Sequence, residues 1–489
     1  MESTATIVHE GGTNVKRIRH LLTSNLLVLA LIFSHCAVPA AAPSTDAPAA
    51  TDAYLETQMR AQQIPGVSLA VFKHGVPIYV KSYGVATLEH AVPAKPETLF
   101  QIGSIGKQFT AVALMLLAKE HRLELDAPLD KYLPEVPPNW HAVTLRRMLN
   151  HQSGIPQLND TDHQRLDLHR EYSDAELVQL ASSQPLDFEP GTDASYSDTA
   201  YVLLGVVINR TLPGFYGDFL RARVFGPLGM SRTRVLSDTD IIPDRASGYE
   251  LSATGSVQNQ AWVSAALNRT ADGSLYSTAL DLGRWDAALY GETILSQTDL
   301  ARMWTIDPLS DNKLPLYHYG YGWEINALRG EPVIEYDGNW QGFQASMARY
   351  VHQGLTVVVL TNRSLCRAQR LAHTVAGYFD PTLKPYDLAA HDVMPEKTQR
   401  FRQLLAAAAA GQGSAGWSRA LTRELKSAGP IKNVVLSEEY VATGSTRPGA
   451  SGHSIERVYR VELALIDDYF RVRYGRAGNV EALDLYREF

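Results

Sequence analysis

Two pairs of apolar runs, each joined by a short polar turn, predict two β-hairpins in the first 380 residues. Residues 66–72 and 76–83 form the first pair, and Lys73-His74-Gly75 between them has the composition of a turn. Residues 345–350 and 355–361 form the second pair. Because the last run is apolar throughout, we expect it to lie in the middle of a sheet with both faces covered.

Helical patterns fill much of the region between the two hairpins. Residues 111–118 are apolar on every side, which indicates a helix buried in the core. Residues 200–208 predict a second apolar helix, and residues 367–379 are expected to form a closing helix.

Aromatic residues alternate with other residues between positions 317 and 323, and this period of two predicts a strand. Its four aromatic side chains would share one face: Tyr317, Tyr319, Tyr321 and Trp323. That face could pack in the core or line a substrate cleft, and the sequence leaves both roles open.

The pattern of apolar and polar positions is interrupted around residues 384–397, where two prolines and mixed charges occur. This interruption predicts a domain boundary. Residues 401–410 are rich in alanine and predict a helix. Short alternating runs follow at residues 433–436, 458–466, 469–474 and 480–486. We therefore expect a main domain at residues 53–385 and a small α+β domain with an antiparallel sheet at residues 396–489.

The first 52 residues have the composition of an export signal followed by a linker. Lys16, Arg17 and Arg19 precede an apolar stretch, and the small residues at 40–42 suit cleavage by signal peptidase. The unbroken apolar core, residues 26–33, is much shorter than the roughly 20 residues of a spanning helix. We expect a signal peptide at residues 1–42, a linker at residues 43–52 and a periplasmic or secreted protein. Retention of the segment as a membrane anchor is the alternative.

Composition and charge narrow the classes of partner. The chain has 489 residues, enough for two domains, and its formal net charge of −7 argues against nucleic acid, which needs a basic surface. Of the two cysteines, Cys36 lies in the predicted signal, so Cys366 has no disulfide partner after cleavage. Neither H-E-x-x-H nor a paired C-x-x-C occurs, so we predict no metal or cofactor. A small molecule or peptide is the expected partner, and the oligomeric state stays open.

Ser104 and Lys107 form the first chemical signal, at the start of the apolar helix. Serine is a natural first residue of a helix, and a separation of three residues places both side chains on one face. A serine hydroxyl is a poor nucleophile until a base removes its proton. A buried lysine near the positive end of a helix can serve as that base. Because S-x-x-K is short, it gains weight only together with other elements.

Two further elements could complete such a site. Residues 189–198 form a turn that opens onto the helix at 200–208 and displays Tyr196 and Asp198. A phenol near an ammonium group can lose or relay a proton more easily. The alternative is an ordinary helix cap, with Ser197 or Asp198 capping and Tyr196 packing. The third element, Tyr336-Asp337-Gly338-Asn339, precedes a strand, where exposed N–H groups can stabilise an oxyanion; a tight strand turn is its alternative.

The order and spacing of these elements resemble the serine beta-lactamase-related family, which includes class C beta-lactamases, D-Ala-D-Ala carboxypeptidases, D-aminopeptidases and related esterases. S-x-x-K is a signature of such enzymes. The resemblance covers about residues 53–379. Its supporting matches are Leu149-Asn150-His151-Gln152-Ser153-Gly154, Pro227-Leu228-Gly229-Met230, Gly273-Ser274-Leu275-Tyr276-Ser277-Thr278 and Tyr319-Gly320-Tyr321-Gly322-Trp323.

The resemblance implies an α/β (α+β) fold in which helices flank an antiparallel sheet and a helical subdomain is inserted. It also implies a serine hydrolase that acts on an amide or ester bond, and the predicted signal peptide makes it an exported one. Ser104 would be acylated, Lys107 and Tyr196 would shuttle protons, and the backbone N–H groups of Ser104 and Asn339 would form the oxyanion hole. Asp198, Tyr336 and Gly338 would line the substrate site. The C-terminal domain resembles the small NTF2-like appendages fused to such hydrolases.

Two positions depart from the family pattern. Asp198 stands where the family usually has the asparagine of Y-x-N, and Tyr336 stands where it usually has lysine or histidine. A carboxylate only accepts hydrogen bonds, and its charge beside Lys107 would weaken that lysine as a base. The missing cation at position 336 would weaken binding of a substrate carboxylate.

These departures predict poor activity on penicillins and cell-wall peptides, and better activity on esters or amides without that carboxylate. A penicillin-binding-like protein that binds or senses a cell-envelope ligand with little turnover is the alternative.

Overall fold

The computed structural model describes residues 46–158, 166–315, 317–328, 331–383, 395–410, 431, 433–442, 454–462, 467–474 and 480–487. The predicted signal peptide lies outside these residues, as does most of the predicted domain boundary. Among the described residues, no helix combines the length and apolar composition that a bilayer span requires.

A seven-stranded antiparallel sheet forms the centre of the main domain, with the order β3-β2-β1-β12-β11-β10-β9. Both predicted hairpins are confirmed, and β12 lies inside the sheet, between β1 and β11. The strands are β1 (Gly66–Lys73), β2 (Val76–Thr87), β3 (Val92–Pro93), β9 (Glu324–Leu328), β10 (Glu331–Trp340), β11 (Phe343–Tyr350) and β12 (Leu355–Thr361).

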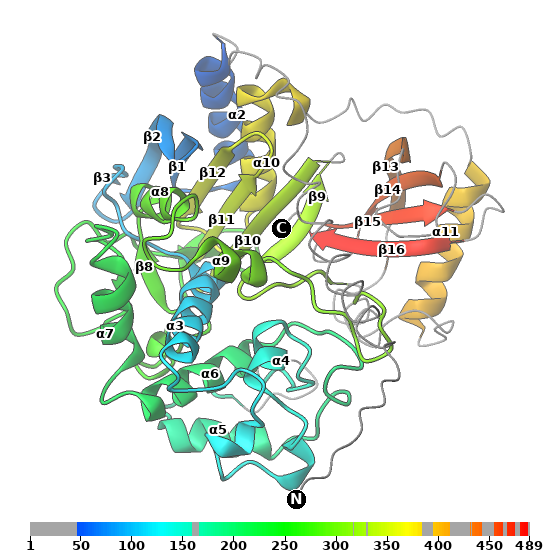
Figure 1. Cartoon of the computed structure of the whole chain (residues 1–489). Helices are drawn as coiled ribbons and strands as arrows, with labels where there is room; N and C mark the ends of the chain where they lie inside the picture. The colour runs from blue at the N-terminus through cyan, green and yellow to red at the C-terminus, as the bar shows by residue number, and fades with distance from the viewer. Residues whose placement is uncertain are drawn as a thin grey trace, which may run out of the picture. The chain divides into compact units, whose positions relative to one another are not determined.

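Helices cover both faces of this sheet, so its central strands are apolar on both sides. In β1, Leu69 and Val71 pack into the cluster that holds α2 (Ala47–Gln62) and α10 (Ala368–Phe379). The next residues along the strand, Ala70 and Phe72, pack into the opposite cluster. Figure 1 shows α2 and α10 side by side on one face, with α8 (Ala279–Ala288), α9 (Gln297–Met303) and α3 (Lys107–Lys119) elsewhere around the sheet. This arrangement explains why every residue of β12 is buried.

The first helix begins earlier than the sequence predicts. We expected a linker at residues 43–52, but α2 starts at Ala47. Pro48 lies in its first turn, where the missing N–H leaves no helical hydrogen bond unmade. Ala47, Thr51 and Leu55 are buried, so packing rather than local composition stabilises this turn. Residues 47–52 of the predicted linker are therefore part of the folded domain.

A helical region is inserted between the strands, as predicted. It holds α4 (Leu145–Leu149), α5 (Asp174–Ser182), α6 (Asp198–Thr211) and α7 (Tyr216–Leu220), and the last continues into a π-helical turn at Arg221–Phe225. Small sheets border this region: β4 (Phe100–Gln101), β8 (Leu275–Ser277) and β5 (Arg234–Val235) form one, and β6 (Tyr249–Leu251) pairs with β7 (Val257–Asn259).

The predicted strand at residues 317–323 is wrong. This segment is irregular, and β9 begins only at Glu324. Gly322 adopts a positive φ of 71°, and an added Cβ there would lie 2.7 Å from the carbonyl oxygen of Lys107. The chain therefore bends at this glycine and packs closely on the start of α3. Tyr321 and Trp323 are buried in the core, whereas Tyr319 packs against the rings of His151 and Tyr196.

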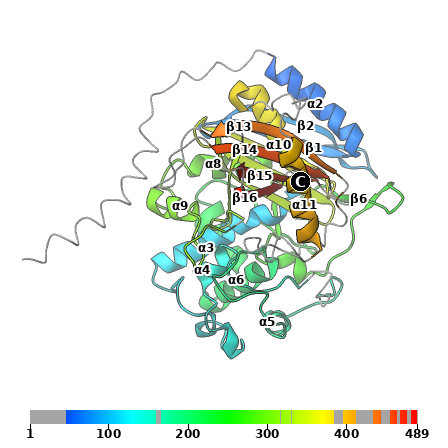
Figure 2. The ribbon, with the colours of Figure 1, turned by 90° about the vertical axis from the view of Figure 1, so that its right-hand side faces the viewer.

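The C-terminal residues form a separate four-stranded antiparallel sheet in the order β13-β14-β15-β16, preceded by α11 (Pro395–Ala409). Figure 2 shows these strands running side by side. Their bounds are Asn433–Ala442, Ser454–Glu462, Asp467–Tyr474 and Val480–Arg487, so the sheet overlaps each predicted run, although the first strand is longer. The NTF2-like assignment stays a prediction.

Candidate active site

Ser104 lies in a 3-10 turn, Gly103–Gly106, that leads directly into α3. Ser104 therefore precedes the α-helix, which begins at Lys107, and is not its first residue as we expected. The separation of three residues still brings the two groups together, with Lys107 Nζ 3.0 Å from Ser104 Oγ. The side chain of Lys107 is fully buried, because the first eleven residues of α3 are all buried.

The start of α6 brings two further groups to Ser104. Ser197 caps this helix by accepting a hydrogen bond from the Ala200 N–H, so the capping role belongs to Ser197. Tyr196 and Asp198 on either side of it point to Ser104 and Lys107. Tyr196 Oη lies 2.6 Å from Ser104 Oγ, and Lys107 Nζ donates to Asp198 Oδ1 at 2.6 Å. The structure thus brings four predicted site residues into one hydrogen-bonded group.

Charges within this hydrogen-bonded group shift the pKa values of Asp198 and Tyr196. Burial opposes ionisation of Asp198, but its contacts with Lys107 outweigh that effect and hold the pKa of the carboxyl below its ordinary value. Burial and the Asp198 charge raise the pKa of the Tyr196 phenol well above its ordinary value. We expected the nearby ammonium group to ease loss of the Tyr196 proton; the shift runs in the opposite direction. Tyr196 is therefore a protonated phenol at neutral pH.

Asp272 is a member of the site that the sequence did not reveal. Its backbone oxygen accepts a hydrogen bond from Lys107 Nζ at 2.6 Å. Burial and the charge of Asp198 raise the pKa of its carboxyl to about 6. The only signal was its position immediately before the family match that starts at Gly273.

His151 was also missed, although it lies within one of the family matches. Its ring packs against those of Tyr196, Tyr319 and Tyr201 at centroid distances of 4.8, 4.6 and 5.3 Å. His151 Nδ1 accepts a hydrogen bond from the Ser197 N–H, which leaves the ring proton on Nε2. Burial and then the Lys107 charge lower the pKa of His151 to about 3, so the ring is neutral. The neutral His151 ring therefore holds the Tyr196 ring in place by packing against it.

The edge of β10 borders the site beyond Glu324, the first residue of β9. β9 pairs with β10 only as far as Glu335, which leaves residues 336–340 without that neighbour. A Cβ added to Gly338 would lie 1.8 Å from the Ile102 oxygen and 3.1 Å from the Ser104 nitrogen. A Cβ added to Gly103 would lie 2.7 Å from the Asn339 nitrogen. The backbones of Ser104 and Asn339 are therefore packed together, and only glycine allows this approach.

Tyr336 lies beneath the surface of the site. It is only 2% exposed, and its Oη is 3.5 Å from His151 Nε2. Position 336 therefore carries no positively charged side chain. Asp337 follows the strand alternation to the other face of β10, opposite Ser346 on β11. Burial raises the pKa of the Asp337 carboxyl well above its ordinary value.

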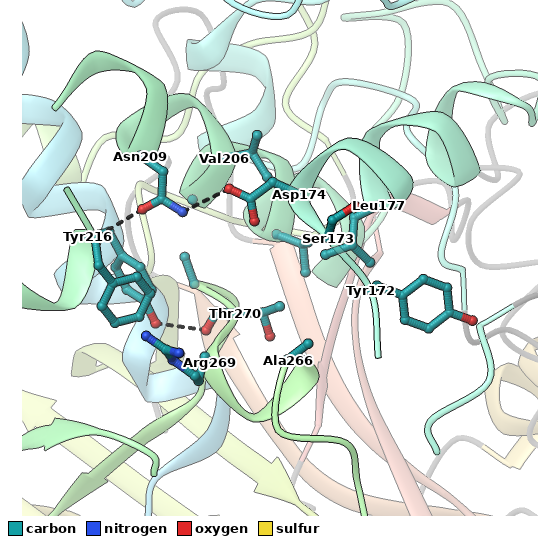
Figure 3. Close-up of a pocket in the computed structure, with 14 residues that line it drawn as sticks. Tyr172, Ser173, Asp174, Leu177, Val206, Asn209, Tyr216, Ala266, Arg269 and Thr270 are labelled. Atoms are coloured by element: carbon teal, nitrogen blue, oxygen red, sulfur yellow. Dashed lines mark hydrogen bonds between the residues drawn. The ribbon is translucent and has the colours of Figure 1, made fainter. Parts of the chain in front are cut away.

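A separate cavity of about 250 Å³ lies between α5, α6, α7 and residues 266–271, and Ser104 is not part of its lining (Figure 3). Several of its polar groups bond to each other: Asn209 donates to Asp174 at 3.1 Å, and Tyr216 Oη donates to the Thr270 oxygen at 2.9 Å. Within the described part of the chain, no group of three His, Cys, Asp or Glu side chains is placed to hold a metal ion.

A serine and a lysine at the start of a core helix, beside the edge of an antiparallel sheet covered by helices, are the arrangement of the serine beta-lactamase-like hydrolases. The chain belongs to the beta-lactamase family, whose family model matches residues 51–376. The predicted resemblance and the predicted fold class are thereby confirmed.

Curated relatives within this family have several activities in their names. The chain is 30% identical over 322 residues to penicillin-binding protein 4* of Bacillus subtilis (strain 168), which covers 63% of this chain and 70% of that protein. It is 27% identical over 329 residues to a D-aminopeptidase of Gluconobacter oxydans (strain 621H), covering 65% of this chain and 60% of that protein.

Solved structures show the same fold. A D-stereospecific amidohydrolase from Streptomyces sp. has a TM-score of 0.58 at 26% identity, over 67% of this chain and 97% of that chain. The D-amino acid amidase from Ochrobactrum anthropi SV3, in complex with D-phenylalanine, has a TM-score of 0.59 at 25% identity, over 68% of this chain and 99% of that chain. An octameric penicillin-binding protein homologue from Pyrococcus abyssi has a TM-score of 0.60 over 90% of this chain at 21% identity, a likeness of fold alone.

Proposed function

We propose that this serine hydrolase cleaves an amide or ester bond through an acyl-enzyme on Ser104. The observation that carries the proposal is the position of Ser104 Oγ between Lys107 Nζ at 3.0 Å and Tyr196 Oη at 2.6 Å. A nucleophilic hydroxyl needs partners that accept its proton and stabilise its charge, and hydrogen-bond distance is the geometry for both. Lys107 and Tyr196 are these two partners of Ser104 Oγ in the proposal.

The carbonyl oxygen of the substrate would bind at the backbone N–H groups of Ser104 and Asn339. Supporting this role, the close packing of Gly338 and Gly103 holds the two backbones together beside the nucleophile. Backbone donors in a rigid setting stabilise the charge that develops on the oxygen during attack.

The substrate class we propose is an amide or ester without a free carboxylate next to the scissile bond, such as the amide of a D-amino acid. The D-aminopeptidase and D-amino acid amidase among the similar proteins support the amide and its configuration. The absence of a cation at Tyr336 supports the lack of a substrate carboxylate, because a carboxylate is bound most strongly by a charged donor. Penicillins carry that carboxylate and would react slowly.

A binding protein with little turnover is the second candidate, favoured by the 2.6 Å ion pair between Lys107 and Asp198. Both candidates would act outside the cytoplasm if residues 1–42 are a signal peptide, which we propose from the basic residues and apolar core of that segment.

Labelling of the mature protein tests the proposal. We expect one adduct with an activated ester or a serine-reactive phosphonate, read by intact mass. Ser104→Ala should take up no label and Lys107→Ala should label far more slowly. Ser256→Ala, which removes an exposed serine in the turn between β6 and β7, should label like the wild type.

Turnover then separates the two candidates. We expect repeated hydrolysis of D-amino acid amides, slower hydrolysis of the L-amides and only slow reaction with benzylpenicillin. A wild type that folds but takes up no label contradicts the proposed function. Labelling of Ser104 without release of the acyl group would support the binding protein instead.

A further inference from the structure

Lys107 uses all three of its ammonium hydrogens in hydrogen bonds. Its Nζ donates to Ser104 Oγ at 3.0 Å, to Asp198 Oδ1 at 2.6 Å and to the backbone oxygen of Asp272 at 2.6 Å. An ammonium group has three donors and no acceptor. A nitrogen with three donated bonds has no lone pair directed at the Ser104 hydrogen, so Lys107 cannot receive that hydrogen in this arrangement.

The Lys107 hydrogen bonds fix which atom donates in the two remaining hydrogen bonds of the group, Ser104–Tyr196 and Tyr196–Asp198. Ser104 Oγ already accepts a hydrogen from Lys107, so its own hydrogen points to Tyr196 Oη at 2.6 Å. Tyr196 in turn donates its single hydrogen to Asp198 Oδ1 at 2.7 Å, since an ionised carboxylate can only accept. A continuous chain of donors runs from Ser104 through Tyr196 to Asp198.

We propose that Asp198 is the final acceptor of the Ser104 proton and that Lys107 remains an ammonium group throughout acylation. As Ser104 Oγ forms its bond to the substrate carbonyl carbon, the carbonyl π electrons move to the oxygen. The Ser104 proton passes to Tyr196 Oη, and the Tyr196 proton passes to Asp198 Oδ1. When the bond to the leaving group breaks with its electron pair, the same chain run backwards returns one proton to that group. The proposal rests on the acyl-enzyme function proposed above.

The surroundings of Asp198 suit this role. Gln157 donates to Asp198 Oδ2 at 2.7 Å and accepts from the Asp198 N–H at 2.6 Å, which fixes the carboxylate plane. The charged or titratable groups that face it are Lys107 on α3, Tyr196, the neutral His151 and Asp272. The lowered pKa of Asp198 keeps it ionised across the neutral range, so the acceptor is available there.

Lys107 has a different task in this arrangement. Its donated hydrogen bond to Ser104 Oγ stabilises the negative charge that builds on that oxygen as its proton leaves. The family asparagine at position 198 could not accept a proton in this way, because an amide oxygen is not a base at neutral pH. The substitution therefore moves the base from the lysine to the carboxylate.

The test is the rate of Ser104 labelling by an activated ester between pH 5 and 10. For Asp198→Asn we expect a fall of about 10²- to 10⁴-fold at pH 7, the usual contribution of a general base. The residual rate should then rise with pH, as hydroxide becomes the acceptor. For Asp198→Ala we expect partial recovery in sodium formate but not in sodium chloride at equal ionic strength. Thermal unfolding curves show whether each variant is folded.

Three results would overturn the inference. If the Asp198→Asn protein labels as fast as the wild type, or faster, then Lys107 is the base and the Asp198 carboxylate weakens it. A uniform loss of rate at every pH, without rescue by formate, reduces Asp198 to a positioning residue. A wild type without any label removes the proposed function and this inference with it, whereas the first two results leave the acyl-enzyme intact.

Discussion

At the scale of single residues, Asp272 is an acid whose charge the folded protein accommodates poorly. Its side chain is only 8% exposed, and its Oδ1 has no hydrogen-bond partner within the described structure. Asp198 lies near enough to oppose a second negative charge. The pKa of about 6 therefore reflects burial first and repulsion second. This acid protonates in a range where Asp198 stays ionised.

This shift makes stability depend on pH. The folded-state pKa of Asp272, about 6, lies above the ordinary value of 3.8, so the folded state holds the proton more tightly than the unfolded chain. Its contribution is fully present below about pH 4 and is lost as the pH rises through about 6. We expect Asp272→Asn to raise the free energy of unfolding at pH 8 by about 1–3 kcal/mol and to give no such gain at pH 4. Urea unfolding at the two pH values checks this. A gain of equal size at pH 4 would assign the effect to packing.

At the scale of elements, the contact between β10 and the 3-10 turn sets the geometry of the site. The backbones of Gly338 and Ser104 approach so closely that no side chain fits between them. In the proposed function, the turn supplies the nucleophile and the strand edge supplies the Asn339 N–H. Two segments more than 230 residues apart in the sequence therefore have to dock before any reaction geometry exists.

Gly338→Ala tests this docking. The new methyl group would displace β10 from the turn, so we expect Ser104 labelling to fall by about 10²-fold or more, as when an oxyanion donor is removed. Gly291→Ala is the matched control, because its Cβ would meet only the Ala288 oxygen, at 3.9 Å. Labelling kinetics and melting curves are measured together. A folded Gly338→Ala protein with the wild-type rate would show that the close approach is not needed.

At the scale of the whole molecule, the residues of the site and both large core clusters lie between Ala47 and Leu383. Buried residues of the C-terminal part, such as Phe401 and Tyr459, form their own stacked ring contact at 4.6 Å. The family match also ends before this part, at residue 376. Among the described residues, the proposed site and its two large core clusters therefore belong to the main domain.

Removal of residues 396–489 follows as a test at this scale. We expect the shortened protein to fold cooperatively and to label Ser104 within about threefold of the full chain, because no site residue or large core cluster is lost. Circular dichroism and labelling kinetics are the measurements. A folded but unlabelled product would assign a direct role in the site to the C-terminal part.

Much of this architecture could be predicted from local patterns. The hairpins, the buried α3 and the Ser104–Lys107 pair depend on neighbours along the chain, and so they were found. Asp272 and His151 were missed because only the tertiary fold brings them to Lys107 and Tyr196. The predicted strand at residues 317–323 failed because alternation alone does not reveal that Gly322 bends the chain. The start of α2 was missed because its first turn is stabilised by burial that its Ala- and Pro-rich sequence does not show.

The pairing of β1 with β12, together with the packing of α2 on α10, has a consequence for synthesis of the chain. The ring of Tyr54 contacts that of Tyr378 at 6.0 Å, and Val67 faces Thr361 across the sheet. The first segment of the domain therefore cannot adopt its final packing until residue 379 has left the ribosome. At roughly 5–20 residues per second, this wait is on the order of 15 to 60 seconds. The nascent chain exposes the apolar faces of α2 and β1 throughout that time, so we expect this segment to be the part most open to aggregation or chaperone binding during synthesis.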